Sequence, residues 1–143
     1  MNKPYHHTQI GYVILVALGA ALLLLTGLML ANGFDWVALM VLLFLAVCLV
    51  MFATLTVEID DEALLVRFGP GPIQKRFRLA DISSCRVVKN PWYYGWGIHL
   101  TPSGWLYNVS GFWAVELQMK TGQKYRLGTD DPQGLVQAVQ DRL

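Results

Sequence analysis

The pattern of hydrophobic and polar residues changes near residue 55. Before this point, residues 10–30 and residues 36–55 form two apolar stretches, and Asp35 is the only charged residue from residue 10 to residue 55. As α-helices these stretches would each be about 30 Å long, which matches the hydrocarbon core of a bilayer. We therefore predict two transmembrane helices, at residues 10–30 and 36–55.

A cleavable signal peptide is the alternative interpretation of residues 10–30. The apolar segment of a signal peptide spans about 7–15 residues and precedes a cleavage site made of small residues. The first stretch is longer, has no convincing cleavage site and is followed at once by the second stretch. The sequence therefore favours two spans.

The two spans are joined by a short connection in which Asn32-Gly33 supplies the turn. Such a hairpin places both chain ends on the same side of the membrane. The connection contains no Lys or Arg, whereas Lys3 precedes the first span and Arg67 follows the second. The positive-inside rule therefore predicts cytoplasmic N- and C-termini, with residues 1–9 as a cytoplasmic tail.

Small residues recur at seven-residue spacing on both spans, at Ala20 and Gly27 and at Ala46 and Ala53. This spacing is typical of close helix packing, either within the hairpin or between two copies of the chain, so a homo-oligomer stays open. Neither span contains Asp, Glu, Lys, Arg or His, the residues that mark ion and proton pathways. The sequence therefore gives no support to a transporter.

From residue 56 onward apolar residues alternate with polar ones, which is typical of strands with one buried face. The last segment changes to helical spacing, with Asp131 as N-cap and Pro132 at the first helical position. About seven strands are expected, at residues 56–59, 64–68, 76–79, 83–88, 97–101, 113–119 and 124–127. We predict an α+β membrane protein in which residues 56–143 form an antiparallel β-barrel or sandwich with a C-terminal α-helix.

This arrangement resembles bacterial membrane proteins that carry a pleckstrin-homology-like (PH-like) domain behind an N-terminal helical hairpin. Two segments carry the resemblance, NPWYYGWGIHLTPSGWLYNVSG (residues 90–111) and GTDDPQGL (residues 128–135). The resemblance implies a PH-like fold at the bacterial inner membrane and a scaffold or binding role. It does not imply inositol-lipid recognition, because phosphoinositide-binding PH domains have basic residues where this chain has Asp60-Asp61-Glu62.

An aromatic segment is expected where the domain meets the membrane. The first strand follows the second span without a linker, so alternating strands bring the turns at residues 69–72, 89–96 and 120–123 back toward the bilayer. An additional strand at residues 105–109 would move the last of these turns to the opposite end. Segment 89–97 contains five side chains suited to an interface or a binding site: Lys89, Trp92, Tyr93, Tyr94 and Trp96. Three hypotheses stay open, in which the rings fill the end of the barrel, contact lipid or line a small-ligand pocket.

Basic residues also gather in the first half of the predicted β domain, at Arg67, Lys75, Arg76 and Arg78. Strand alternation spreads them over two faces, which is typical of a solvated surface, and a patch that attracts anionic lipid is the alternative. The net charge of the whole chain is only +1, which gives no argument for nucleic-acid binding.

Composition and motifs narrow the chemistry further. Only 15% of the residues are charged, against about 25% in soluble proteins, because the two spans dilute the charge. Cys48 lies within a span and Cys85 in the β domain, so they cannot pair, and unpaired thiols suit a reducing compartment. No phosphate loop, metal-binding motif or nucleophile motif occurs, so we expect no catalytic residues, cofactor or metal.

The sequence thus predicts a non-enzymatic, membrane-anchored PH-like module that contacts membrane lipids and binds a protein partner or organises a membrane complex. PH-like domains leave edge strands and a groove beside the helix that accept peptides. The alternative is a module that senses the membrane surface through segment 89–97.

Overall fold

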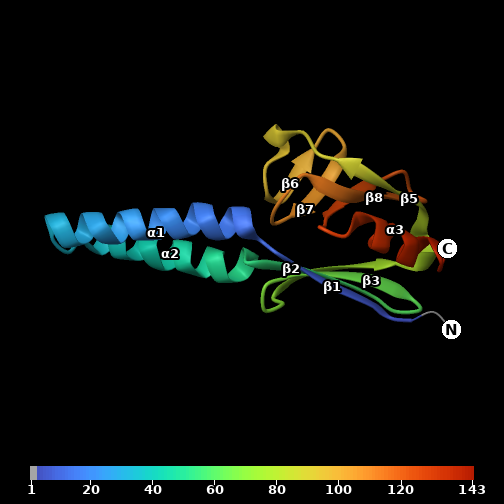
Figure 1. Cartoon of the computed structure of the whole chain (residues 1–143), viewed down its shortest axis with the longest axis horizontal. Coiled ribbons are helices and arrows are strands. Elements are labelled where there is room, and N and C mark those ends of the chain that lie inside the picture. The colour runs from blue at the N-terminus through green and yellow to red at the C-terminus, as the bar shows by residue number, and fades with distance from the viewer. Residues whose placement is uncertain (1–2) are drawn as a thin grey trace.

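The computed structural model describes residues 3–143, in which two long helices project from one end of a β-rich domain (Figure 1). In chain order the elements are β1 (Tyr5–Ile10), α1 (Tyr12–Asn32), α2 (Trp36–Phe52), β2 (Thr54–Ile59), β3 (Ala63–Phe68), β4 (Ile73–Arg78), the 3-10 turn η1 (Leu79–Asp81), β5 (Ile82–Lys89), the 3-10 turn η2 (Trp92–Tyr94), β6 (Gly97–Thr101), β7 (Gly104–Asn108), β8 (Trp113–Met119), β9 (Lys124–Gly128) and α3 (Pro132–Gln140).

Helices α1 and α2 lie side by side over the predicted spans. By length and composition α1 is able to cross a membrane, whereas α2 is equally apolar but only 17 residues long. Asp35 caps α2, because its carboxylate accepts a hydrogen bond from the Ala38 amide at 3.0 Å. The predicted end of the second span at residue 55 is wrong: α2 ends at Phe52, and Leu55 is buried in the β domain with 1% of its surface exposed. Hydropathy does not distinguish a lipid-facing leucine from one in a protein core.

Residues 1–2 of the predicted N-terminal tail lie outside the described residues. From Tyr5 onward the predicted tail is instead part of a strand, β1. Strand β1 pairs with β2 along its whole length, from Tyr5 opposite Ile59 to Ile10 opposite Thr54. The strand is possible because α1 and α2 begin and end beside each other, so the chain entering α1 runs next to the chain leaving α2. Edge pairing of this kind satisfies the backbone groups of β2.

The strands of residues 3–143 form two sheets, with strand orders β1-β2-β3-β4 and β5-β8-β9-β7-β6. Neighbouring strands are antiparallel, apart from β7 and β9, which pair in parallel. Of the predicted barrel and sandwich, the barrel is therefore wrong, because the two sheets share no strand pairing within these residues. Residues 3–143 contain nine strands where about seven were predicted, and β1 and β7 are the additional ones.

The core fills the space between the two sheets and α3, which lies between them in Figure 1. Leu135 and Val139 of α3 are fully buried there, on the apolar stripe that the sequence predicts. Asp131 caps α3 by accepting a hydrogen bond from the Gly134 amide at 3.2 Å. The helix packs mainly against β5 and β8 of the second sheet.

The strands alternate between a helix-facing end and a far end of the domain. At the helix-facing end, the turn after β3 touches α2 so closely that a Cβ atom at Gly69 would lie 2.6 Å from the Val50 and Met51 carbonyl oxygens. At the far end, the amide of Lys120 donates to the carbonyl of Asp81 at 2.8 Å. The prediction that turn 120–123 faces the helices is therefore wrong, because β7 adds one more crossing of the domain.

Candidate functional site

The predicted aromatic segment 89–97 lies at the helix-facing end and folds over the outer face of the second sheet (yellow in Figure 1). The side chains of Trp92 and Tyr93 in the η2 turn are exposed, with residue exposures of 76% and 67%. Their rings contact each other edge to face, with centroids 5.8 Å apart. Two large aromatic side chains thus project from the domain at the level where the helices enter it.

Tyr94 and Trp96 hold this segment in place. The Tyr94 ring lies 5.7 Å from the Arg126 guanidinium carbon, and its hydroxyl is 3.0 Å from the Ser103 hydroxyl. The Trp96 indole Nε1 donates to the Gly111 carbonyl at 3.0 Å. Tyr94 therefore covers the outer face of a sheet, and no closed barrel exists whose end it would fill.

Beneath Tyr94 a row of charged side chains crosses three neighbouring strands. Arg86 on β5, Glu116 on β8 and Arg126 on β9 lie directly opposite one another. The Glu116 carboxylate, only 4% exposed, accepts from Arg126 Nε at 3.0 Å and from Arg86 Nη2 at 3.1 Å. Arg126 Nη1 also donates to Asn90 Oδ1 at 2.9 Å, which ties the start of the aromatic segment to the sheet. Such pairing is what permits charges to be buried.

Further exposed aromatic side chains at the same end were missed by the sequence analysis. Trp113 is 50% exposed at the start of β8, with the ammonium of Lys89 5.6 Å from its ring, and the Phe112 ring packs against Trp96 with centroids 5.9 Å apart. The alternation of β8 predicted a buried Trp113, but the strand begins beyond the edge of the core. We name Trp92, Tyr93, Trp96, Phe112 and Trp113 the helix-end aromatic residues.

The four predicted basic residues do not form one patch. Arg67 pairs with Glu58 on the neighbouring strand at 3.2 Å. Lys75 lies 5.9 Å from the ring centroids of Phe77 and Tyr125 and covers the edge of the core. Arg76 and Arg78 point to the far end of the domain, where they line a cleft. Of the four residues, only Arg76 and Arg78 therefore share one site.

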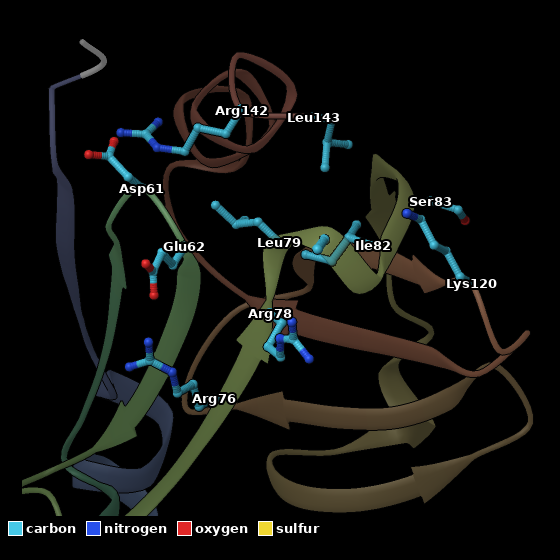
Figure 2. Close-up of a pocket in the computed structure, with 11 residues that line it drawn as sticks. Asp61, Glu62, Arg76, Arg78, Leu79, Ile82, Ser83, Lys120, Arg142 and Leu143 are labelled. Atoms are coloured by element: carbon cyan, nitrogen blue, oxygen red, sulfur yellow. The ribbon is translucent and has the colours of Figure 1, made fainter.

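The far-end cleft has a volume of about 910 Å³ and is formed by the β2–β3 turn, β4, η1, the β8–β9 turn and the end of the chain. Figure 2 shows the basic side chains Arg76, Arg78 and Lys120 around the apolar residues Leu79 and Ile82. None of the ion pairs found among residues 3–143 includes these three cations. The cleft thus offers unpaired positive charge beside an apolar floor.

Acidic groups also border this cleft, at Asp61 and Glu62. The neighbouring Asp60 carboxylate faces its own turn, because it accepts hydrogen bonds from the amides of Glu62 at 2.8 Å and Ala63 at 2.7 Å. These backbone hydrogen bonds lower the pKa of Asp60. The turn is thereby fixed at the rim of the cleft.

The structure brings together no group of three His, Cys, Asp or Glu side chains that could hold a metal ion in the described part of the chain. His7 contacts Asp130 and His6 lies 3.3 Å from Glu58, so both histidines pair with acids along β1. The His99 ring contacts the Trp96 carbonyl. Cys85 is buried against α3, and this burial raises the pKa of its thiol. These groups stabilise the domain.

Comparison with known proteins gives no family to which the chain belongs. No protein-family model matches it, and no curated protein is similar enough to count as a relative.

Proposed function

We propose that this protein is a non-enzymatic, membrane-anchored binding module whose PH-like domain is held against the inner face of a bacterial membrane and presents its far-end cleft to a protein partner. In this proposal α1 and α2 cross the bilayer as a hairpin, and both chain ends are cytoplasmic. The observation that carries it is the direct connection between the helix pair and the domain.

The connection leaves no flexible linker on either strand. Gly11 alone separates β1 from α1, and Ala53 alone separates α2 from β2; the Gly11 amide donates to the Ala53 carbonyl at 2.7 Å. There is no room for a side chain at Gly11, since a Cβ atom there would lie 2.9 Å from the Phe52 carbonyl oxygen. Because the helices and the first sheet are joined in this way, the membrane would fix the direction in which the domain points.

The length of α2 is compatible with a span. Its 17 residues extend for about 26 Å, and small mismatches are met by bilayer thinning or by flanking residues. Phe34 and Trp36 stand at the opposite end of the hairpin, both exposed and packed edge to face at 4.9 Å. Aromatic residues favour membrane interfaces, so these two rings suit the second surface of the bilayer.

The experiment that tests the anchoring is cysteine labelling in spheroplasts, with Cys48 and Cys85 replaced by serine. A single cysteine is placed at Asn32 in the hairpin connection or at Gln123 in the far-end turn. We expect a membrane-impermeant maleimide to label N32C in intact spheroplasts and Q123C only after permeabilisation. Labelling of both positions from the same side would overturn the proposal.

A second function, sensing of the membrane surface, is favoured by the exposure of Trp92 and Tyr93 at the helix-facing end. They belong to the turn η2, which connects β5 to β6 at this end of the second sheet. Their contact with headgroups would make the tilt of the domain depend on lipid composition.

A further inference from the structure

We propose that a crevice between α1 and the start of β6 binds one acyl chain of a membrane lipid. The crevice has a volume of about 270 Å³ and lies at the junction of the helix pair and the domain. It is lined by Val13, Ile14, Ala17, Leu18, Phe52, Trp96 and Gly97. The inference rests on the proposed membrane anchoring and adds to it a lipid site on this chain.

The walls of this junction crevice come from three elements. Val13, Ile14, Ala17 and Leu18 recur at helical spacing and form one face of α1. Phe52 closes the crevice at the last residue of α2, and Trp96 faces it from the domain. Every lining side chain is apolar, apart from the indole N–H of Trp96, which is already bonded to Gly111. The site therefore has no partner for a polar or charged ligand.

The domain side of the crevice is already formed without a ligand. The Trp96 ring is fixed by its hydrogen bond to the Gly111 carbonyl and by packing against Phe112. Gly97, which also lines the crevice, has a φ of 94°, a conformation that side-chain-bearing residues rarely adopt, so glycine is favoured at this position. A ligand would therefore meet a fixed wall and lose little free energy to ordering the protein.

The size and position of the crevice select an acyl chain. Its volume lies below the range of about 300–1,000 Å³ that is typical of pockets for whole small molecules, and an α-helix needs a width of about 10–12 Å. The site thus takes a narrow apolar segment. It continues along the surface of α1, whose apolar span is not buried by the rest of the chain. In a membrane the molecules that lie against this surface are lipids, and an acyl chain in the crevice gains close packing against its apolar walls.

The test uses the full chain in phosphatidylcholine vesicles, with Trp96 as its only tryptophan and phenylalanine at the other four tryptophan positions. Bromine on the acyl chains quenches tryptophan at contact. We expect brominated lipid to remove more than half of the Trp96 fluorescence. The variant Ala17→Phe fills the crevice and should return most of that fluorescence, whereas Ala20→Phe, one turn further along α1 and outside the crevice, should leave the quenching unchanged. Circular dichroism confirms that each variant folds.

Each outcome separates this proposal from the anchoring on which it rests. A chain with Trp36 as its only tryptophan reports insertion of the hairpin tip. If Trp36 is quenched and Trp96 is not, or if Ala17→Phe leaves the Trp96 quenching unchanged, the acyl-chain site is wrong while the anchoring stands. If neither tryptophan is quenched, the anchoring itself is wrong.

Discussion

Glu116 and Arg126 face each other across β8 and β9, and the carboxylate accepts a hydrogen bond from Arg126 Nε at 3.0 Å. This pair lies beneath the aromatic segment, and Asn90 joins the segment to it. The helix-end aromatic residues are therefore supported by a buried ion pair in the sheet.

Glu116→Ala should destabilise the domain strongly. Removing one partner of a buried pair leaves an uncompensated charge on Arg126, which costs about 3–5 kcal/mol. The matched control is Glu58→Ala, which breaks the part-exposed pair with Arg67 and should cost about 0–1 kcal/mol. Denaturant unfolding of the full chain in detergent micelles measures both free energies of unfolding. Equal losses for the two variants would contradict the structural role given to Glu116.

Alanine at two glycines should have opposite effects. Gly11→Ala should lower the melting temperature, because the added Cβ atom would lie 3.0 Å from Val109 Cβ and 2.9 Å from the Phe52 carbonyl oxygen. Gly19→Ala, inside α1 with nothing within 4 Å of the added atom, should be neutral or raise it, since alanine favours helix. Thermal circular dichroism checks both. A tolerated Gly11→Ala would mean that the helices and the domain are loosely joined.

Trp92 should contact lipid if the domain senses the membrane surface. In vesicles, a chain with Trp92 as its only tryptophan should be quenched by bromine near the headgroup end of the acyl chains. A chain with only Trp105, which is 41% exposed next to the far-end β6–β7 turn, should be quenched by aqueous iodide and not by lipid. Equal lipid quenching of the two, or none for Trp92, would remove the sensing function and leave the binding module unaffected.

Charge reversal in the far-end cleft should prevent partner binding. A photocrosslinking residue at Ser83, which lines the cleft, should form a discrete adduct in native membranes. Arg76→Glu with Arg78→Glu should abolish that adduct, because the two cations with no ion pair are then replaced by acids. The control Lys75→Glu with Lys124→Glu makes the same change in net charge outside the cleft. If the control removes the adduct equally well, the partner responds to overall charge and not to the cleft.

Asp60 should make stability depend on pH. Hydrogen bonds from the Glu62 and Ala63 amides lower its pKa in the folded chain, so the stabilisation is present above the unfolded pKa and is lost as the pH falls through the folded pKa. Asp60→Ala should therefore be less stable than the unchanged chain at neutral pH, and the difference should shrink below pH of about 4. Unfolding curves between neutral and acidic pH measure it. A difference that does not vary with pH would show that the ionised carboxylate has no part in it.

The sequence predicted those helices and strands whose hydrophobic pattern follows directly from their surroundings. The apolar runs become α1 and α2, the alternating segments become strands, and Asp131 caps α3 as expected. Strand β7 was not among the predicted strands because Trp105, Leu106 and Tyr107 are all apolar, so no alternation marks it. Tyr107 packs against the core cluster from one face of the strand, and Leu106 is fully buried on the other.

The candidate sites were predicted only where local composition marks them. The aromatic residues of segment 89–97 stand out in the sequence, and strand alternation places them at the helix-facing end. The burial of Glu116 under that segment does not follow from alternation, which assigns this residue to a polar face. The far-end cleft combines Arg76 with Lys120 and Leu143, which lie far apart in the sequence, so only the fold brings them together.

The pairing of β1 with β2 has a mechanical consequence. Both strands run along the long axis of the molecule, in line with the helices to which they connect (Figure 1). Both strands join the helices at the same end, where Ile10 lies opposite Thr54. A pull on the far end would therefore reach α2 along the covalent backbone of β2, and the β1–β2 ladder would pass part of the load through β1 to α1, so that both helices resist it.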